Sequence, residues 1–294
     1  YRLVHAEGDG LPGLVIDRFG DAVALQPNAA WIDARLDALV AALDAVIAPT
    51  AIAVNAGSRA RALEKLEGES RILRGDLSAP VPVTMNGATY LADLAGGQKT
   101  GLFYDQRPNH EFAARLAAGR DVLDVFSHVG GFGLAALANG AASALAVDGS
   151  APALALAAEG AARTGVADRF GALKAQAFDA LRDFGEEGRR FGMVVCDPPA
   201  FAPNKPALTR GLRAYEKTAR LAAKLVEPGG WLVLCSCSHA ADPASFREAC
   251  VRGIAAARRT AALVHEGGAG PDHPAHFALP ETSYLKALFY RMLD

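Results

Sequence analysis

The chain contains 294 residues, of which 51% are hydrophobic and 21% are charged, and its formal net charge at pH 7 is −2. This is the composition of an ordinary globular protein, and the length is enough for a sizeable core and two domains. No apolar run approaches the roughly 20 residues that a membrane span needs, and the first residues resemble neither a signal peptide nor a transit peptide. A membrane protein is therefore excluded. The near-neutral net charge neither supports nor excludes nucleic-acid binding, because acidic residues elsewhere on the surface can balance a basic face.

Four cysteines, Cys196, Cys235, Cys237 and Cys250, are too few for a disulfide framework in a chain of this size. The Cys235-Ser-Cys237 segment has no second cysteine pair and no clustered histidines, so no metal site is predicted. We expect a reducing, cytoplasmic compartment.

Residues 1–93 are predicted to form a small α+β domain. Short apolar runs alternate with glycine and proline turns, and one amphipathic stripe has the spacing of a helix. The expected elements are strands at 14–16, 22–25, 51–54 and 71–73, one helix over 31–47, and a hairpin over 82–94 that turns at Asn86-Gly87.

A group of basic residues with interleaved glutamates lies within this first domain. The sequence favours a solvated charged surface, and RNA contact is the alternative. The basic residues are Arg59, Arg61, Lys65, Arg71 and Arg74.

Two glycine turns then bracket the polar residues Gln98, Lys99 and Thr100, the second turn being at Gly101. So many hydrogen-bonding side chains favour a binding loop over a plain interdomain linker.

From residue 94 to the end, apolar strands alternate with helical patterns. This alternation predicts an α/β domain with a doubly wound, mostly parallel sheet and right-handed crossovers. The expected strands are 121–126, 143–148, 170–175, 191–197, 231–235, 261–265 and 285–292. The expected helices are 111–118, 132–138, 151–163, 178–184, 208–225 and 243–257.

The stretch from Asp121 to Gly133 organises this domain. A buried strand runs into the Gly130-Gly131 turn and then into a helix, which is typical of a nucleotide-binding βαβ unit. The next strand ends at Asp148, whose carboxylate can accept from the two hydroxyls of a ribose. The alternative is a structural turn in which Asp148 caps the following helix.

The ends of two later strands also carry reactive groups. In Asp197-Pro-Pro-Ala-Phe201, the carboxylate can accept from an exocyclic amine and the ring can stack on a base. The alternative is a plain turn with an aromatic plug. Cys237 lies further toward the ligand crevice than Cys235, so its thiolate is the candidate nucleophile, although a buried core cysteine is an equal alternative at this point.

These motifs occur together in one known family. The chain resembles the class I S-adenosylmethionine-dependent methyltransferases that form 5-methylcytosine in large-subunit ribosomal RNA. The matching segments span nearly the whole chain: Gly8-Asp-Gly-Leu-Pro-Gly-Leu14, Asp17-Arg18, Gly97-Gln-Lys-Thr-Gly101, Asp105-Gln-Arg107, Phe126-Ser127, Gly130-Gly-Phe132, Asp197-Pro-Pro-Ala-Phe201, Cys235-Ser-Cys-Ser238 and Gly270-Pro-Asp-His-Pro274. Family members usually begin with an RNA-binding PUA domain, and we expect this chain to begin where that domain would end.

The resemblance implies a seven-stranded Rossmann-like methyltransferase sheet, S-adenosylmethionine as cofactor and ribosomal RNA as partner, and it leaves a homodimer open. Cys237 would be the nucleophile that adds to C6 of cytosine, with Asp197 beside the methyl group and the base. The implied cofactor-binding residues are Gln98, Lys99, Thr100, Gly101, Asp124, Phe126, Ser127, Gly130, Gly131, Phe132, Asp148, Gln176, Phe178, Asp197 and Pro198. The implied substrate-binding residues are Pro199, Phe201, Lys205 and Arg107.

Five positions depart from the family pattern, and two of them, Gly149 and Gly160, replace more polar residues. Ala200 stands where many such enzymes have a second cysteine, so release of the adduct would use another base. Gln176 replaces the acid on the adenine side, and His128 replaces an aromatic residue. Two other functions therefore remain as alternatives: a purine-ring RNA methyltransferase without covalent catalysis, and a non-catalytic module that binds the cofactor or RNA.

Overall fold

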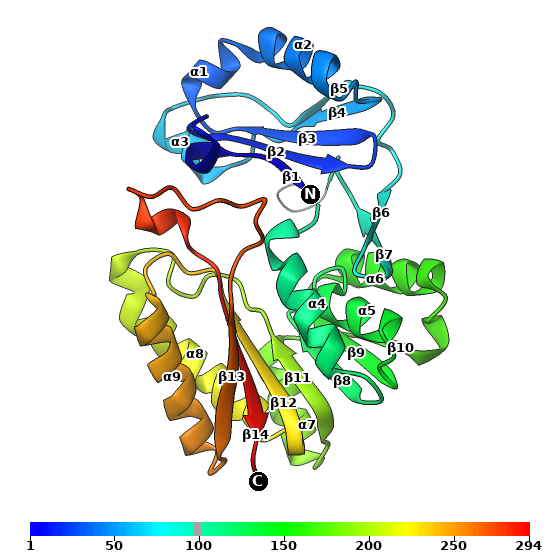
Figure 1. The fold of residues 1–294 in the computed structure, drawn as a ribbon, viewed down its shortest axis with the longest axis vertical. Helices are drawn as coiled ribbons and strands as arrows, with labels where there is room; N and C mark the ends of the chain where they lie inside the picture. The colour runs from blue at the N-terminus through cyan, green and yellow to red at the C-terminus, as the bar shows by residue number, and fades with distance from the viewer. Residues whose placement is uncertain (97–100) are drawn as a thin grey trace. The chain divides into compact units, whose positions relative to one another are not determined.

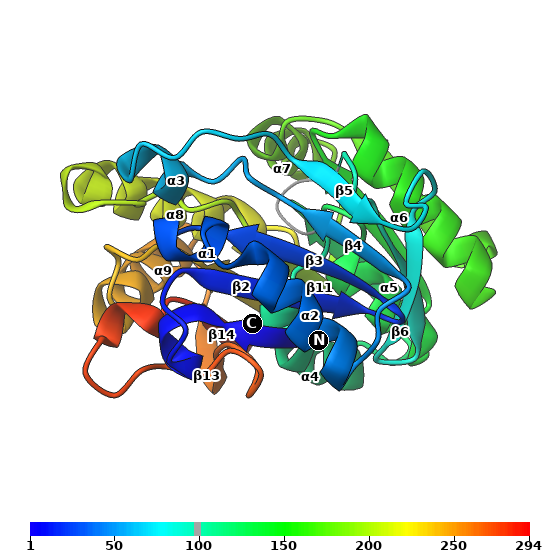
Figure 2. The same cartoon turned by 90° about the horizontal axis from the view of Figure 1, so that it is seen from above.

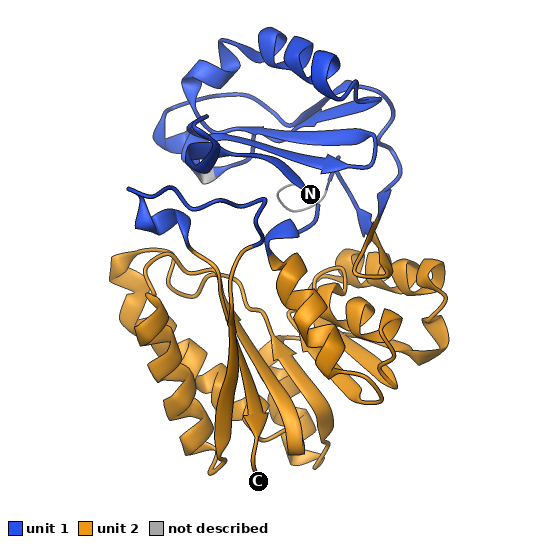
Figure 3. Ribbon diagram, viewed as in Figure 1, with its two compact units in different colours: residues 1–83, 91–105, 270–283 blue, residues 84–90, 106–269, 284–294 orange. Residues whose placement is uncertain are grey.

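The computed structural model describes residues 1–96 and 101–294, and the chain forms two compact units (Figure 3). Unit 1 comprises residues 1–83, 91–105 and 270–283. Unit 2 comprises residues 84–90, 106–269 and 284–294. Each unit is therefore assembled from segments that are far apart in the sequence.

Unit 1 contains a five-stranded sheet in the order β1-β2-β3-β4-β5. Neighbouring strands are antiparallel except β3 and β4, which are parallel and are joined by two helices that cross over the sheet. The strands are β1 (Arg2–His5), β2 (Leu14–Phe19), β3 (Ala22–Pro27), β4 (Ala51–Val54) and β5 (Arg71–Arg74), and the helices are η1 (Ala6–Asp9), α1 (Ala30–Asp33), α2 (Leu36–Val46) and α3 (Arg59–Leu63).

The expected single helix over 31–47 was wrong, because the chain breaks between α1 and α2. Arg35 has φ −120° and ψ 14°, outside the helical region. The break lets Ile32 of α1 and Leu43 of α2 bury against the same sheet core, which also contains Leu25 and Ile52. Figures 1 and 2 show α2 lying over this sheet.

The expected solvated surface was also wrong for Arg61, which is 3% exposed. Its guanidinium pairs with both carboxylate oxygens of Asp33 and donates to the carbonyl oxygens of Pro27 and Glu67. Arg61 therefore joins three segments of unit 1. Arg74, by contrast, is only partly buried and pairs with Asp44.

Unit 2 contains a seven-stranded sheet in the order β10-β9-β8-β11-β12-β14-β13. The first five are mutually parallel, and β14 is antiparallel to both of its neighbours. The strands are β8 (Asp121–Val125), β9 (Ser143–Asp148), β10 (Phe170–Lys174), β11 (Phe191–Cys196), β12 (Val226–Ser236), β13 (Ala261–Gly267) and β14 (Lys286–Met292). The sequence-based prediction of a doubly wound, mostly parallel sheet is thus confirmed.

Helices cover both faces of this sheet, as Figure 1 shows. One face carries α7, α8 and α9, whose apolar side chains share a core with β8, β11 and β12. The other face carries α4, α5 and α6. The α-helices are α4 (Arg107–Leu116), α5 (Gly131–Ala138), α6 (Ala151–Thr164), α7 (Ala177–Glu186), α8 (Leu208–Ala223) and α9 (Pro243–Ala256), and the 3-10 helices are η3 (Ala167–Arg169) and η4 (Lys205–Ala207). Two further 3-10 helices, η2 (Tyr104–Gln106) and η5 (Pro280–Thr282), contain residues of unit 1.

Two predictions had different outcomes. Asn86 and Gly87 have φ of 53° and 82°, so the hairpin of β6 (Val81–Met85) and β7 (Ala88–Ala92) turns where expected. The strand expected over 231–235 begins earlier, because β12 starts at Val226 and includes Pro228-Gly229-Gly230. The register against β11 shifts there, with Val226 opposite Phe191 and Trp231 opposite Met193. A bulge therefore accommodates the extra residues.

Within the part of the chain that the structure describes, no helix has both the length and the apolar character needed to cross a bilayer.

Candidate cofactor and catalytic site

Four neighbouring parallel strands of unit 2 end at one edge of the sheet. Phe126 follows β8, Asp148 ends β9, Asp197 follows β11 and Cys237 follows β12. Ligands of doubly wound sheets bind outside this carboxyl edge, at the point where strand order reverses. In this sheet the reversal falls between β8 and β11, so the edge brings the predicted residues into one region.

The turn after β8 bends sharply in a left-handed conformation. Phe126, His128 and Gly130 have φ of 64°, 50° and 81°. The backbone N–H groups of Phe126 and Ser127 both donate to the carbonyl of Val147 on β9, at 2.9 and 3.1 Å. This turn therefore directs the chain into α5, which begins at Gly131.

Asp148 holds the turn from the neighbouring strand. Its Oδ2 accepts from the N–H of His128 and its Oδ1 from the N–H of Ser150, both at 2.8 Å. The side chain that caps α6 is that of Ser150, which accepts from Ala153. Each Asp148 oxygen retains a lone pair, so the carboxylate can still accept from ribose hydroxyls.

Two buried polar atoms in the turn have no hydrogen-bond partner among the described residues: Ser127 Oγ and Asp124 Oδ1. Such atoms are costly to bury unless a ligand or water completes them. The other Asp124 oxygen accepts from the N–H of Gly133 at 2.8 Å, and burial raises the Asp124 pKa to about 7. A protonated Asp124 would donate as well as accept, so the turn fits a ligand with polar groups such as the amino acid end of S-adenosylmethionine.

Gly131 is enclosed by two side chains that the sequence did not single out. A Cβ on Gly131 would lie 2.8 Å from both Cε1 and Nε2 of His110, so no larger residue fits without movement. The hydroxyl of Tyr90 donates to the Gly131 carbonyl at 3.0 Å. His110 is buried, which lowers its pKa to about 3, and its ring packs edge-on against Phe132.

Three phenylalanine rings cluster beside the strand ends. Phe126, Phe178 and Phe201 have centroid separations of 6.1 to 6.5 Å, and Phe178 and Phe201 are nearly parallel at 22°. Gln176 precedes α7, and its Nε2 would lie 3.8 Å from a Cβ at Gly149, which follows Asp148. The residues predicted to surround an adenine and a target base thus lie next to the glycine turn.

The comparisons with known proteins agree with this geometry. The profile of the family described as S-adenosylmethionine-dependent methyltransferase matches residues 26–291. The chain belongs to this family. Its cofactor is S-adenosylmethionine, and the orphaned Ser127 hydroxyl and the glycine turn fit that cofactor.

Two similar curated proteins are each named "Ribosomal RNA large subunit methyltransferase I". The one from Shewanella denitrificans is 37% identical over 294 residues, which cover 99% of this chain and 74% of the relative. The one from Photobacterium profundum is 35% identical over 289 residues, which cover 97% of this chain and 72% of the relative.

Solved structures share the fold. A putative methyltransferase from Streptococcus mutans has a TM-score of 0.84 at 20% identity, with 99% of this chain and 74% of that chain covered. SMU.776, a putative methyltransferase crystallised with SAH, has a TM-score of 0.85 at 21% identity, with the same coverage. A tRNA m1G37 methyltransferase from M. jannaschii has a TM-score of 0.61 at 17% identity, with 94% and 71% covered. Identities this low show a common fold and nothing further.

The cysteines of this methyltransferase differ sharply in burial. Cys196, Cys235 and Cys250 are 0 to 1% exposed, and burial raises the pKa of each thiol. Cys237 is only half-buried and lies just beyond β12. Cys196, Cys235 and Cys250 are therefore core residues, and Cys237 is the most exposed of the four cysteines.

The remaining predicted residues lie in different surroundings. Pro198 is buried, Pro199 and Lys205 are exposed, and Arg107 begins α4. Gly101 belongs to unit 1, where its φ is 96°. Gln98, Lys99 and Thr100 lie outside the described residues. Among the described residues, no group of three or more His, Cys, Asp or Glu side chains forms a metal-ligand cluster.

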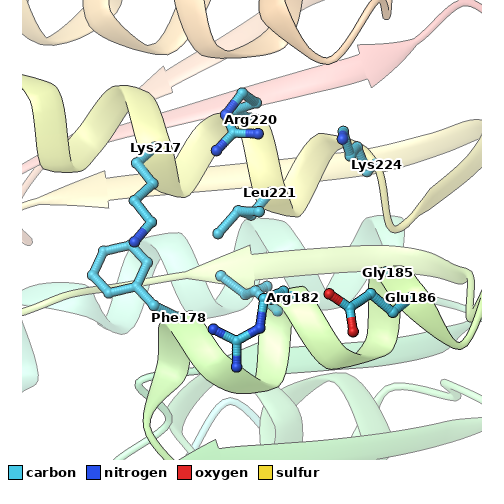
Figure 4. A pocket seen from close by; sticks show the side chains of 9 residues that line it. Phe178, Arg182, Gly185, Glu186, Lys217, Arg220, Leu221 and Lys224 are labelled. Atoms are coloured by element: carbon cyan, nitrogen blue, oxygen red, sulfur yellow. The ribbon is translucent and has the colours of Figure 1, made fainter.

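A basic groove of about 390 Å³ lies between α7 and α8 of the methyltransferase (Figure 4). It shares Phe178 with the aromatic cluster, and the Lys217 ammonium lies 4.5 Å from the centroid of that ring. Four of its lining residues are cations and one is a carboxylate. The lining residues are Phe178, Leu181, Arg182, Gly185, Glu186, Lys217, Arg220, Leu221 and Lys224.

Proposed function

We propose that this methyltransferase forms 5-methylcytosine in large-subunit ribosomal RNA, with Cys237 as the nucleophile. The observation that carries the proposal is the position of Cys237, the half-buried cysteine at the edge where Asp148 and Asp197 also lie. The relatives named for large-subunit ribosomal RNA support the substrate class.

The chemistry explains why a thiol is needed at this edge. C5 of cytosine is a weak nucleophile, and addition of the Cys237 thiolate to C6 places negative charge on C5. S-adenosylmethionine supplies an electrophilic methyl group when it is bound. Loss of the C5 proton and expulsion of the thiolate then restore the aromatic ring and the free cysteine. Ala200 has no ionisable group, so a base other than residue 200 takes the C5 proton.

The residues around the thiol have roles that follow from their positions. Asp197 follows β11, the strand beside β12, and its carboxylate can accept from the exocyclic amine of cytosine. Phe201 offers an aromatic face close to Phe126 and Phe178. A base in a duplex cannot reach this edge, so the target nucleotide is unpaired or flipped out.

The groove between α7 and α8 supports an RNA partner as well. Lys217, Arg220 and Lys224 form no ion pair with another described residue, whereas Arg182 already pairs with Asp179 and Asp183. Cations without carboxylate partners along a groove suit a phosphate backbone. Because the groove adjoins Phe178, it would bind nucleotides next to the target base.

The alternative is a purine-ring RNA methyltransferase that uses no covalent adduct. The observation in its favour is Ala200, which stands where many 5-methylcytosine enzymes have a second cysteine. The two functions differ in their need for Cys237, because only cytosine C5 methylation requires a thiolate addition.

The test measures methyl transfer to unmodified large-subunit ribosomal RNA, followed by mass spectrometry of the nucleosides. We expect 5-methylcytosine from the wild type, no product from Cys237→Ser, and full activity from the control Cys250→Ser. RNA containing 5-fluorocytosine should trap a covalent adduct with the wild type and with Cys250→Ser, but not with Cys237→Ser. Full activity of Cys237→Ser, or a methylguanine product, would overturn the proposal. Cofactor binding without transfer to any RNA would favour the binding-module function.

A further inference from the structure

Lys286 is a buried lysine at the start of β14. Lys286 is 8% exposed, and the next four residues of the strand, up to Tyr290, are apolar or aromatic. In the sheet, Lys286 lies directly opposite Ser236 of β12. Its Nζ donates to the carbonyl oxygens of Ser238 and Ala241, at 2.7 and 2.8 Å. These two carbonyls bracket the loop that follows Cys237, so Lys286 holds that loop closed.

A second set of contacts holds the same segment from α8. The Tyr215 hydroxyl accepts from Ser236 Oγ at 2.9 Å and lies 2.7 Å from Ser238 Oγ. Ser238 Oγ in turn accepts from the N–H of Ala202, at 2.9 Å. Ser236 and Ser238 flank Cys237, so the backbone on both sides of the thiol is fixed by buried hydrogen bonds.

No ion pair with a described carboxylate neutralises the charge of Lys286. Both of its hydrogen-bond partners are neutral carbonyls, and no described carboxylate forms an ion pair with it. Asp242 caps α9 by accepting from the N–H and the hydroxyl of Ser245. A buried cation favours an anion close by, and two groups lie near enough to raise the Lys286 pKa against the effect of burial: the Cys237 sulfur first and the Asp242 carboxylate second. Burial lowers the Lys286 pKa to about 8, so most of the population keeps its proton at pH 7.

The other titratable groups around Cys237 do not supply this charge. Burial raises the pKa of Tyr215, which leaves it neutral near pH 7. Asp197, from the segment after β11, places a carboxylate near the strand end. After burial, it is the next cause that raises the pKa of Cys235. His239 lies in the same loop, where its ring packs against Tyr284.

We propose that Lys286 is a positioning residue for the Cys237 thiol: it fixes the 238–241 loop through two carbonyls and supplies the positive charge beside which the sulfur ionises. The catalytic use of the thiol rests on the proposed function above. The effect of Lys286 on the thiol does not, because it requires neither RNA nor cofactor.

The test measures the rate of iodoacetamide alkylation of Cys237 in the full chain as a function of pH. Cys196, Cys235 and Cys250 are buried, and Cys237→Ser should abolish the fast labelling. We expect Lys286→Met to raise the thiol pKa by about one unit, which lowers the thiolate fraction at pH 7 roughly tenfold. The control Lys174→Met, an exposed lysine on β10, should leave the profile unchanged. A Lys286→Met profile that coincides with the wild type would overturn the proposal.

Lys286→Gln separates the charge from the hydrogen bonds, because its amide can still donate to the loop carbonyls. We expect the same rise in thiol pKa, and a wild-type profile would refute the electrostatic role. This variant also decides the matter if Lys286→Met does not fold. The two proposals fail separately. If Cys237→Ser still methylates RNA, the covalent function is refuted, while the alkylation result for Lys286 stands. If Cys237→Ser is inactive but Lys286→Gln has the wild-type alkylation profile, the role of Lys286 is refuted, while the covalent function stands.

Discussion

The hydroxyl of Tyr90 donates a 3.0 Å hydrogen bond to the backbone carbonyl of Gly131. Tyr90 is fully buried on β7, and burial raises its pKa, so it stays a neutral donor. The bond ties the end of a hairpin to the first residue of α5. The glycine turn of the cofactor site is therefore held by a residue more than 30 positions earlier in the sequence.

Tyr90→Phe should weaken S-adenosylmethionine binding by about 1 kcal/mol, or roughly fivefold in Kd, because one buried hydrogen bond to the turn is lost. Isothermal titration calorimetry measures the change. Tyr290→Phe is the matched control, since the Tyr290 hydroxyl is buried without a partner in the described chain. Equal affinities for the two variants would show that the Tyr90 bond does not shape the turn.

His110 should make the fold sensitive to acid. Its pKa falls from 6.5 when exposed to about 3 in the folded chain, because burial disfavours the charged ring. Between these values the unfolded state binds a proton that the folded state does not, so stability is lost as pH falls below 6.5. The loss from this group approaches about 1.4 kcal/mol per pH unit. Denaturant unfolding of the wild type and His110→Leu at pH 7 and pH 5 tests it, and the variant should lose less stability. Parallel losses would contradict the assignment.

Arg61→Met should destabilise unit 1 by roughly 2–4 kcal/mol, since it leaves two backbone carbonyls and Asp33 without a buried partner. Arg74→Met provides the comparison, because Arg74 forms an exposed pair with Asp44 and its loss should matter little. Urea denaturation gives both values. A small effect of Arg61→Met would mean that the segments it joins are held by other contacts.

The groove between α7 and α8 predicts a specific salt dependence. Replacing both Lys217 and Arg220 with Gln should weaken RNA binding and reduce the slope of log K against log salt by about 1.4, the value for two contacts to single-stranded phosphates. Cofactor affinity should not change.

The control for the groove replaces Arg115 and Arg163, exposed arginines that pair with Glu111 and Glu159 on their own helices. Fluorescence anisotropy with a ribosomal RNA fragment measures both pairs of variants. If the wild type and both double variants have the same slope of log K against log salt, the RNA does not bind in this groove.

Local patterns predicted the elements of unit 2 well. The strand at Ser143–Asp148 was expected with the bounds it has, because an apolar run between polar ends carries the signal by itself. The residues expected at the strand ends followed from the same logic, since parallel strands in this fold share one carboxyl edge.

The features that the sequence did not predict depend on contacts between residues that are far apart in the chain. The break at Arg35 depends on how α1 and α2 share the core of the five-stranded sheet, and the burial of Arg61 depends on Asp33. Lys286 could have been noticed as a charge at the head of an apolar strand, but its partner carbonyls are more than 40 positions away. The contacts of Tyr90 and His110 with Gly131 could not be predicted either, because no local sequence motif indicates them.

The proposed role of Lys286 has a consequence during synthesis, because β14 is the last strand of its sheet to be translated. This strand is the last of the sheet in sequence order, yet it lies between β12 and β13, so β13 has no neighbour until residues 286–292 have emerged. A ribosome that has completed the helices and the cysteine loop has still not delivered Lys286. A nascent chain would therefore carry Cys237 as an ordinary thiol, and its ionisation would be delayed until translation of this strand is finished.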